Sequence, residues 1–158
     1  MTADIGGGIG TQLISILDVS PASRGILFDR PQLGAEPIAH DRMEVIEGDF
    51  FESVPAGADA YLLHWILHDW ADVEAAAILR SLRQTMRPTA RLIVVEPVIP
   101  EGVEFHFGKW TNLQMLVCVG GRERTETGYR ALLTAAGFDL QEVTTTASPL
   151  SLLVAKPV

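Results

Sequence analysis

Residues 64–70 combine side chains that suit proton transfer and aromatic stacking, because two histidines and two tryptophans lie within seven positions. Histidine can remove a proton from a hydroxyl near neutral pH, and tryptophan packs on a cofactor or an aromatic substrate. We therefore expect catalysis or ligand binding here. A metal site made of His64, His68, Asp69 and Asp72 is less favoured, because four ligands within nine residues have no recognised spacing.

Two glutamates are candidates for holding a catalytic histidine in place. Glu96 ends an apolar run, and Glu123 lies in the segment Gly-Gly-Arg-Glu-Arg-Thr. A carboxylate beside an imidazole fixes its tautomer and stabilises its cation, which is the role of the third member of a catalytic triad. The alternative for Glu123 is an ordinary ion pair with Arg122 or Arg124, and the sequence leaves both open.

A glycine-rich turn lies near the start of the chain, where residues 4–10 read Asp-Ile-Gly-Gly-Gly-Ile-Gly. Glycine lets the backbone approach a ligand closely and supplies unusual dihedral angles. The dinucleotide fingerprint Gly-x-Gly-x-x-Gly would place a glycine at position 11, which is Thr11, so the match to an NAD site is poor. The turn indicates a cofactor site or, alternatively, an ordinary tight strand–helix connection.

Two aspartates follow the next two predicted strands. Asp29 lies 23 residues after Gly6, and an acidic residue there accepts both hydroxyls of a ribose in nucleoside-binding α/β folds. Asp49 is placed to accept from an adenine amino group while Phe50 packs on the ring. Together with the glycine turn, these residues predict a nucleoside site. The alternatives are a helix cap or surface acid for Asp29 and a loop acid beside core aromatics for Asp49.

The candidate residues all come directly after predicted strands, in a chain whose strands and helices alternate. The pattern predicts helices over 11–17, 72–86, 109–119 and 126–136, at most a short helix in 31–41, and strands over 2–5, 25–28, 43–46, 58–64, 91–95, 138–145 and 150–155. This alternation is typical of an α/β fold with a doubly wound, mostly parallel seven-stranded sheet. Only residues 147–149 join the last two strands, so we expect that pair to be antiparallel.

Composition narrows the class of protein. The chain has 158 residues, which is the size of one domain. Its net charge of −8 argues against a protein that binds nucleic acids or anionic membranes non-specifically. The single cysteine, Cys118, excludes an internal disulfide and a cysteine-based zinc cage. No apolar run is long enough to span a membrane, and the first residues do not read as a signal peptide. We expect one cytoplasmic α/β domain over residues 1–158.

The motifs, taken in order, carry a family resemblance across nearly the whole chain: DIGGGIG, FDRP, GDFF, YLLHWILHDW, VVEPVIP, GGRERT and AAGF. This series resembles the catalytic domain of the S-adenosylmethionine-dependent O-methyltransferases of the plant caffeic-acid and acetylserotonin type and their bacterial natural-product relatives. The resemblance implies a Rossmann-like class I methyltransferase fold, no metal, and a small phenol or enol as acceptor.

The resemblance also implies a role for each motif residue. His68 would be the general base, flanked by Glu96 and Glu123. Met115 and Cys118 would line the acceptor pocket. The residues implied to contact S-adenosylmethionine are Gly6, Gly8, Asp29, Asp49, Phe50, His64 and Trp70.

The chain departs from the family pattern at several points. His64 stands where relatives usually carry a cofactor-contacting lysine, and Asn112 stands where many carry aspartate. Residues 32–41 are shorter than the helix expected there. The family has an N-terminal helical domain, which implies a homodimer, and we expect no counterpart of it in residues 1–158, either because the sequence is a fragment or because it is a stand-alone domain. Two alternatives therefore stay open: a cofactor-binding relative that catalyses a decarboxylation, hydroxylation or pericyclic step, and a non-catalytic assembly subunit that docks through an exposed helix around 110–119.

Overall fold

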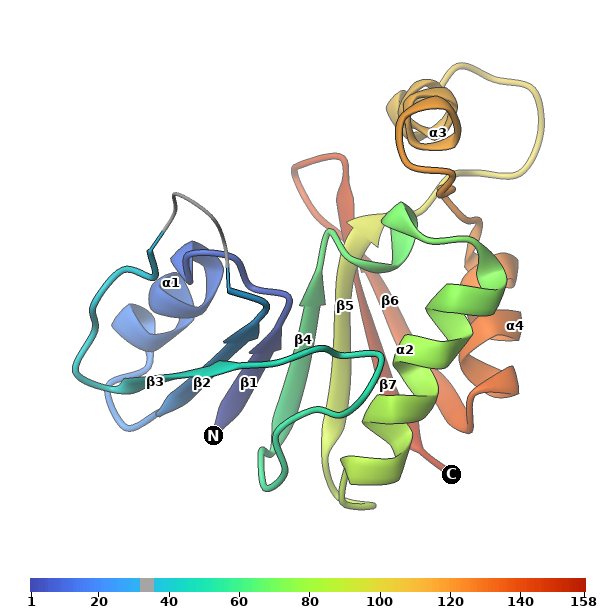
Figure 1. Cartoon of the computed structure of the whole chain (residues 1–158). Helices are drawn as coiled ribbons and strands as arrows, with labels where there is room; N and C mark the ends of the chain where they lie inside the picture. The colour runs from blue at the N-terminus through green and yellow to red at the C-terminus, as the bar shows by residue number, and fades with distance from the viewer. Residues whose placement is uncertain (32–35) are drawn as a thin grey trace.

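The computed structural model describes residues 1–31 and 36–158, and within these ranges seven strands form one sheet in the order β3-β2-β1-β4-β5-β7-β6 (Figure 1). Strand β7 is antiparallel to β5 and β6, and the other neighbouring strands are parallel. The predicted fold class and the antiparallel final pair are confirmed. The strands are β1 (Thr2–Ile5), β2 (Gly25–Asp29), β3 (Met43–Glu47), β4 (Ala60–His64), β5 (Arg91–Pro97), β6 (Phe138–Thr145) and β7 (Leu150–Pro157).

Helices pack on both faces of the sheet. Helix α1 (Thr11–Val19) covers one face, and α2 (Asp72–Thr85) and α4 (Glu126–Ala135) cover the other. The remaining helices are α3 (Phe107–Cys118), which lies outside these two layers (Figure 1), and a short 3-10 helix, η1 (Leu67–Asp69). Strand β2 contributes side chains to the packing on both faces of the sheet. Ile26 and Phe28 belong to the main core with α2 and α4. Leu27 points to the other face, where it packs against Leu13 and Leu17 of α1. A strand buried on both faces must be apolar at every position, as residues 25–28 are.

The face of the sheet that α1 covers at one end is more open at the other. On β5 and β7, every second residue points to this face and is only half-buried: Ile93, Val95, Leu152 and Val154. The residues between them on the same strands, such as the paired Val94 and Leu153, face the other side of the sheet and are fully buried in the core with α2 and α4. The two faces of these strands therefore differ in how far they are covered.

Several boundaries differ from those predicted. Strand β4 begins at Ala60 rather than at residue 58, because its pairing with β1 and β5 begins there, opposite Thr2 and Arg91. Helix α3 begins at Phe107, where His106 caps it by accepting from the amide of Gly108. Of the short helix considered in 31–41, residues 32–35 lie outside the described residues, and 36–40 are not helical.

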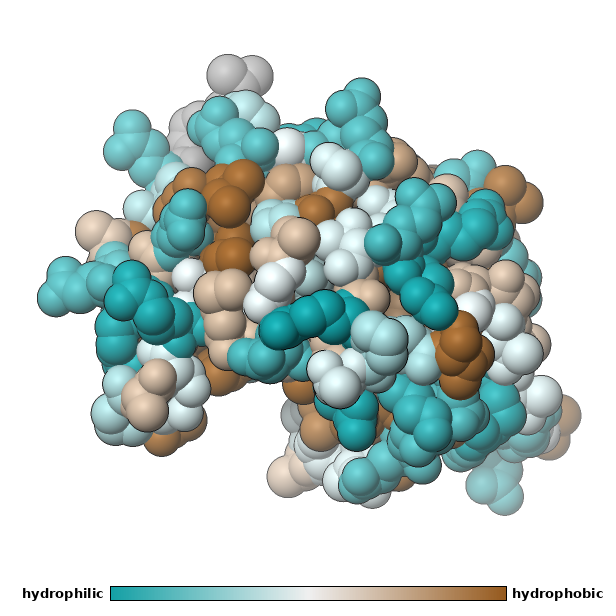
Figure 2. All heavy atoms as spheres, turned by 90° about the horizontal axis from the view of Figure 1, so that it is seen from below, coloured by the Kyte–Doolittle hydropathy of each residue, from teal (hydrophilic) through white to brown (hydrophobic). Residues whose placement is uncertain are grey.

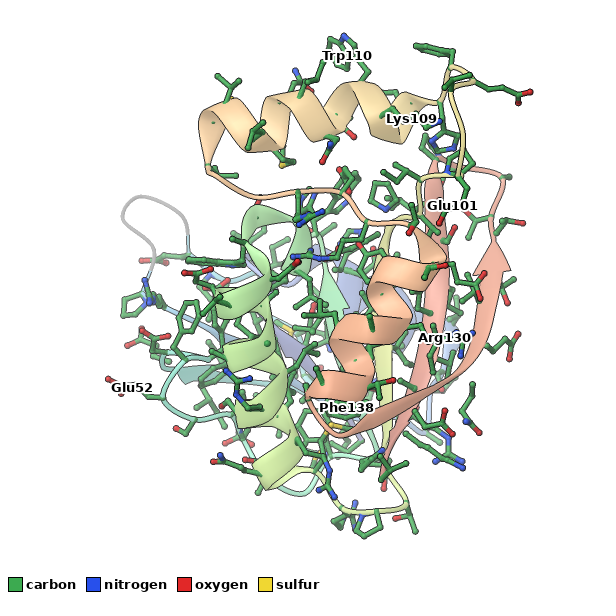
Figure 3. All side chains as sticks on the ribbon, turned by 90° about the vertical axis from the view of Figure 1, so that its right-hand side faces the viewer. Glu52, Glu101, Lys109, Trp110, Arg130 and Phe138 are labelled. Atoms are coloured by element: carbon green, nitrogen blue, oxygen red, sulfur yellow. The ribbon has the colours of Figure 1, made fainter. Side chains whose placement is uncertain are left out.

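Helix α3 stands beyond the carboxyl ends of the parallel strands, apart from the two layers (Figure 1). Trp110 points away from the sheet (Figure 3) and is 53% exposed, and Leu113, Leu116 and Val117 of the same helix are more exposed still. The opposite end of the sheet, seen from below in Figure 2, presents mostly hydrophilic side chains with scattered hydrophobic ones. None of the helices described is long and apolar enough to span a bilayer.

Candidate active site

A tight turn carries the chain from β4 into η1 and places His68 at the carboxyl edge of the sheet. Trp65 adopts a left-handed backbone conformation with φ of 58°, which is uncommon for a bulky residue and marks a conformation imposed by its surroundings. Glu96, fully buried at the end of β5, accepts from the amides of Ile66 at 3.0 Å and Leu67 at 2.5 Å. A carboxylate 29 residues away thus fixes the turn.

Glu96 lies beside His68, as expected, but it contacts the backbone amide of His68 at 3.4 Å and not the imidazole. Its carboxylate binds the backbone of the turn, and its other oxygen accepts from the hydroxyl of Tyr129 at 2.5 Å. Burial raises the pKa of Glu96, and the hydroxyl of Tyr129 and the turn amides oppose that rise. Glu96 shapes the loop that holds His68, and Tyr129 is a site residue that the sequence reasoning missed.

The segment Gly-Gly-Arg-Glu-Arg-Thr packs against the other side of the turn. A Cβ on Gly121 would lie 2.0 Å from the carbonyl oxygen of His68, so only glycine fits there. Arg124, which is 4% exposed, donates to the carbonyls of Leu67 at 2.8 Å and Trp70 at 2.9 Å. The two arginines of this segment also pair with Asp72, so they are not the partners of Glu123.

His68 and Glu123 form the centre of the site. The imidazole Nδ1 lies 3.2 Å from Glu123 Oε1, and Nε2 lies 3.4 Å from Asp69 Oδ1. His68 is 5% exposed and Glu123 2%. Burial lowers the pKa of the imidazole, but the hydrogen bond to Glu123 and the charges of Glu96, Glu123 and Asp69 outweigh burial, so the pKa of His68 is raised.

The glycine turn and Asp29 are in direct contact. The amide of Gly8 donates to Asp29 Oδ2 at 2.7 Å, and the turn uses positive φ at Gly6 and Gly8. A Cβ on Gly6 would lie 2.5 Å from the side chain of Ile66, so the turn packs closely against the segment before His68. Beside Asp29 lies a cavity of about 240 Å³, lined among others by Gly8 and Glu47.

Asp4 is a second residue that sequence reasoning missed, although an acid two positions before the glycines was a visible signal. It is 1% exposed, and its carboxylate oxygens have no hydrogen bond of normal geometry among the described residues, although the backbone of Leu13 is close enough to favour the charged form. Burial and the negative charge of Asp29 raise its pKa to about 7. A Cβ on Gly7 would lie 2.6 Å from this carboxylate, so the orphaned acid sits directly under the turn.

The residues expected around an adenine lie together. The ring of Phe50 lies 6.2 Å from Trp70 and 5.0 Å from Phe51, each edge-on. Asp49 pairs with the guanidinium of Arg30, and the amide of Phe51 holds the pKa of Asp49 below its usual value. The cluster borders the glycine turn, because the Phe50 ring is 3.5 Å from where a Cβ of Gly6 would lie.

Three predicted residues remain: His64, Met115 and Cys118. His64 ends β4, and burial together with the charge of His68 lowers its pKa. Met115 and Cys118 lie on α3, where Met115 is half-buried and Cys118 exposed. The residues of α3 that reach Glu123 are two others, Thr111 and Asn112. Among the described residues, no cluster of three histidine, cysteine or acidic side chains could hold a metal ion.

Residues 1–139 match the family model of the O-methyltransferase domain. The chain is 45% identical to the phenazine O-methyltransferase PhzM of Lysobacter antibioticus over 98% of its own length and 48% of that protein. It is 41% identical to the O-demethylpuromycin-O-methyltransferase of Streptomyces alboniger, over 98% of this chain and 44% of that one. The chain thus spans about half the length of these curated relatives.

Solved structures agree with this match. The calicheamicin-biosynthesis methyltransferase CalO1, in its SAH-bound form, superposes with a TM-score of 0.92 at 37% identity, covering 99% of this chain and 48% of that one. The similarity therefore extends over the whole of the described fold, including the edge of the sheet where His68 and the glycine turn meet.

Proposed function

This chain belongs to the O-methyltransferase family, and we propose that it transfers a methyl group from S-adenosylmethionine to a hydroxyl of a small aromatic or enolic acceptor, with His68 as the general base. The observation that carries the proposal is the buried pair of His68 Nδ1 and Glu123 Oε1, 3.2 Å apart, at the sheet edge that also holds the glycine turn. Ligands of doubly wound folds bind at this edge.

The residues around the glycine turn fit S-adenosylmethionine. Asp29 lines the cavity beside the glycine turn, and its carboxylate suits the two ribose hydroxyls. The orphaned carboxylate of Asp4 lies under the turn and would complement a cofactor that carries positive charge on its sulfur and amino group. Phe50 and Trp70 offer aromatic edges for an adenine. When bound, the cofactor supplies a methyl group that is already activated by the positive sulfur.

His68 then acts on the acceptor. With Nδ1–H donating to Glu123, the lone pair of Nε2 takes the proton of the acceptor hydroxyl while the oxygen bonds to the methyl carbon and the sulfur–carbon bond breaks. The imidazolium formed is stabilised by Glu123 and later releases its proton to solvent. Because His68 is only 5% exposed, this proposal requires the side chain of Asp69 or helix α3 to move when the acceptor binds.

The proposed base gives a definite pH dependence. The imidazole accepts a proton only when it is neutral, and its pKa is raised above 6.5 by the surrounding carboxylates despite burial. The rate of methyl transfer should therefore fall with decreasing pH, with a midpoint above 6.5 rather than below it.

The alternatives are less well supported. Use of the cofactor without methyl transfer is not favoured, because the relatives named above are methyltransferases. The exposed face of α3 suits a docking surface, but it does not account for the buried His68–Glu123 pair. The expected homodimer and cytoplasmic location stay predictions.

The variant His68→Gln tests the proposal. We expect methyl transfer to a panel of phenols, followed with a labelled methyl group, to fall by about 10²–10⁴-fold. Calorimetric titration should give the same affinity for S-adenosylmethionine as the unaltered chain. His40→Gln, the same change at a residue that pairs with Asp18, is the matched control. Unaltered turnover in His68→Gln would remove this residue from the role of base.

A further inference from the structure

Helix α3 contacts the general-base pair through two successive residues. The hydroxyl of Thr111 lies 3.0 Å from Glu123 Oε1, the same oxygen that faces His68 Nδ1. The side-chain oxygen of Asn112 accepts from the backbone amide of Glu123 at 2.8 Å. Thr111 is 7% exposed, so its hydroxyl acts where water does not compete. Neither residue belongs to the set predicted from the motifs.

The single proton of the Thr111 hydroxyl has two acceptors within reach. One is Glu123 Oε1 at 3.0 Å, and the other is the carbonyl of Gly108, one turn earlier in α3, at 3.1 Å. A hydrogen bond to an ionised carboxylate is about twice as strong as one to a neutral carbonyl. While Glu123 is ionised, the proton therefore points to Glu123.

The carboxylate of Glu123 depends on this bond. Its second oxygen, Oε2, is buried and has no hydrogen-bond partner among the described residues. His68 and Thr111 are thus the side chains that satisfy Oε1. A donor to a carboxylate stabilises its charged form and makes it a weaker acceptor for the neighbouring imidazole.

We propose that Thr111 is a positioning residue that sets the strength of His68 as a base, by donating its hydroxyl proton to Glu123 Oε1, which keeps that oxygen aligned with Nδ1 and weakens it as an acceptor for the imidazole. This inference rests on the proposed function only in calling His68 the base. It also links helix α3, on which the predicted acceptor-contacting residues Met115 and Cys118 lie, to the basicity of the imidazole.

Other charged groups face the same imidazole and stay in place in a Thr111 variant. They come from three further elements: Asp69 at the end of η1, Glu96 on β5 and His64 on β4. A change in the titration of His68 on loss of one hydroxyl therefore reports the Thr111–Glu123 bond and not a change in the surrounding charges.

The test compares Thr111→Val, which removes the hydroxyl, with Thr111→Ser, which keeps it. The pKa of His68 is measured by NMR titration of the labelled imidazole in the protein without substrate. The chain has four histidines, and the signal of His68 is the one that is missing from the spectrum of His68→Gln. Thr111→Val should raise the pKa of His68 by about 0.5 unit, because Glu123 becomes a stronger acceptor, and Thr111→Ser should restore it. The acidic limb of the kcat/KM profile should move upward by the same amount.

Thr134→Val, at an exposed helical threonine of α4, is the control and should leave the titration unchanged. If Thr111→Val does not fold by circular dichroism, Thr111→Ala replaces it. A pKa of His68 that is unchanged or lowered in the hydroxyl-free variant overturns the inference. Because the titration needs no turnover, it decides the role of Thr111 even if no methyl transfer is found, which is a failure of the proposed function alone.

Discussion

The buried acid under the glycine turn makes stability depend on pH, and Asp4→Asn isolates that dependence. Asp4 is 1% exposed, and burial followed by the charge of Asp29 raises its pKa from 3.8 to about 7. Asparagine has the same shape and no charge. The variant therefore removes one titration from the folded core while leaving the packing of the turn nearly unaltered.

The sign and the size follow from the shift. Because the folded-state pKa of this carboxyl is raised, the folded protein holds its proton more tightly, and that stabilisation is lost as pH rises from about 4 through 7. One unit of pKa corresponds to about 1.4 kcal/mol, so a shift of about three units costs about 4 kcal/mol in the ionised state. About 3 kcal/mol of this develops between pH 4.5 and pH 8.

Urea unfolding at the two pH values measures the effect. The free energy of unfolding of Asp4→Asn, minus that of the unaltered chain, should be about 3 kcal/mol larger at pH 8 than at pH 4.5, because only the unaltered chain loses stability as Asp4 ionises. The double difference cancels groups that titrate alike in both proteins. Asp41→Asn, at an exposed position, should show no such change. A difference between Asp4→Asn and the unaltered chain that is the same at both pH values would refute the reasoning.

Two further substitutions test how the His68 turn is held. In Gly121→Ala the new Cβ would lie 2.0 Å from the carbonyl oxygen of His68, so the turn must move. Methyl transfer should then fall by about 10²-fold, while calorimetry should still detect binding of S-adenosylmethionine. Full turnover in this variant would contradict the close packing of the turn. In Tyr129→Phe the buried carboxylate of Glu96 loses its hydroxyl donor. The free energy of unfolding, measured with urea, should therefore be lower by about 1–3 kcal/mol. Unaltered stability would show that this hydrogen bond does not stabilise the core.

Much of the fold follows from local patterns in the chain. Continuous apolar runs such as 25–28 read as strands buried on both faces, and Thr125 and Gly137 mark the ends of α4, where the structure has a side-chain cap and a positive φ of 83°. Right-handed crossovers then bring the ends of the parallel strands to one edge. The glycine turn, Asp29 and His68 could therefore be placed near one another from the sequence.

The partners of the buried carboxylates were decided by tertiary structure alone. Glu96 binds the backbone of the His68 turn and Tyr129, whereas Glu123 meets the imidazole and Thr111. These contacts join residues from 12 to 55 positions apart. No periodicity of the chain encodes which of two acids faces a histidine, because that choice depends on how the segment between α3 and α4 folds against the His68 turn and on which buried donors each carboxylate can reach.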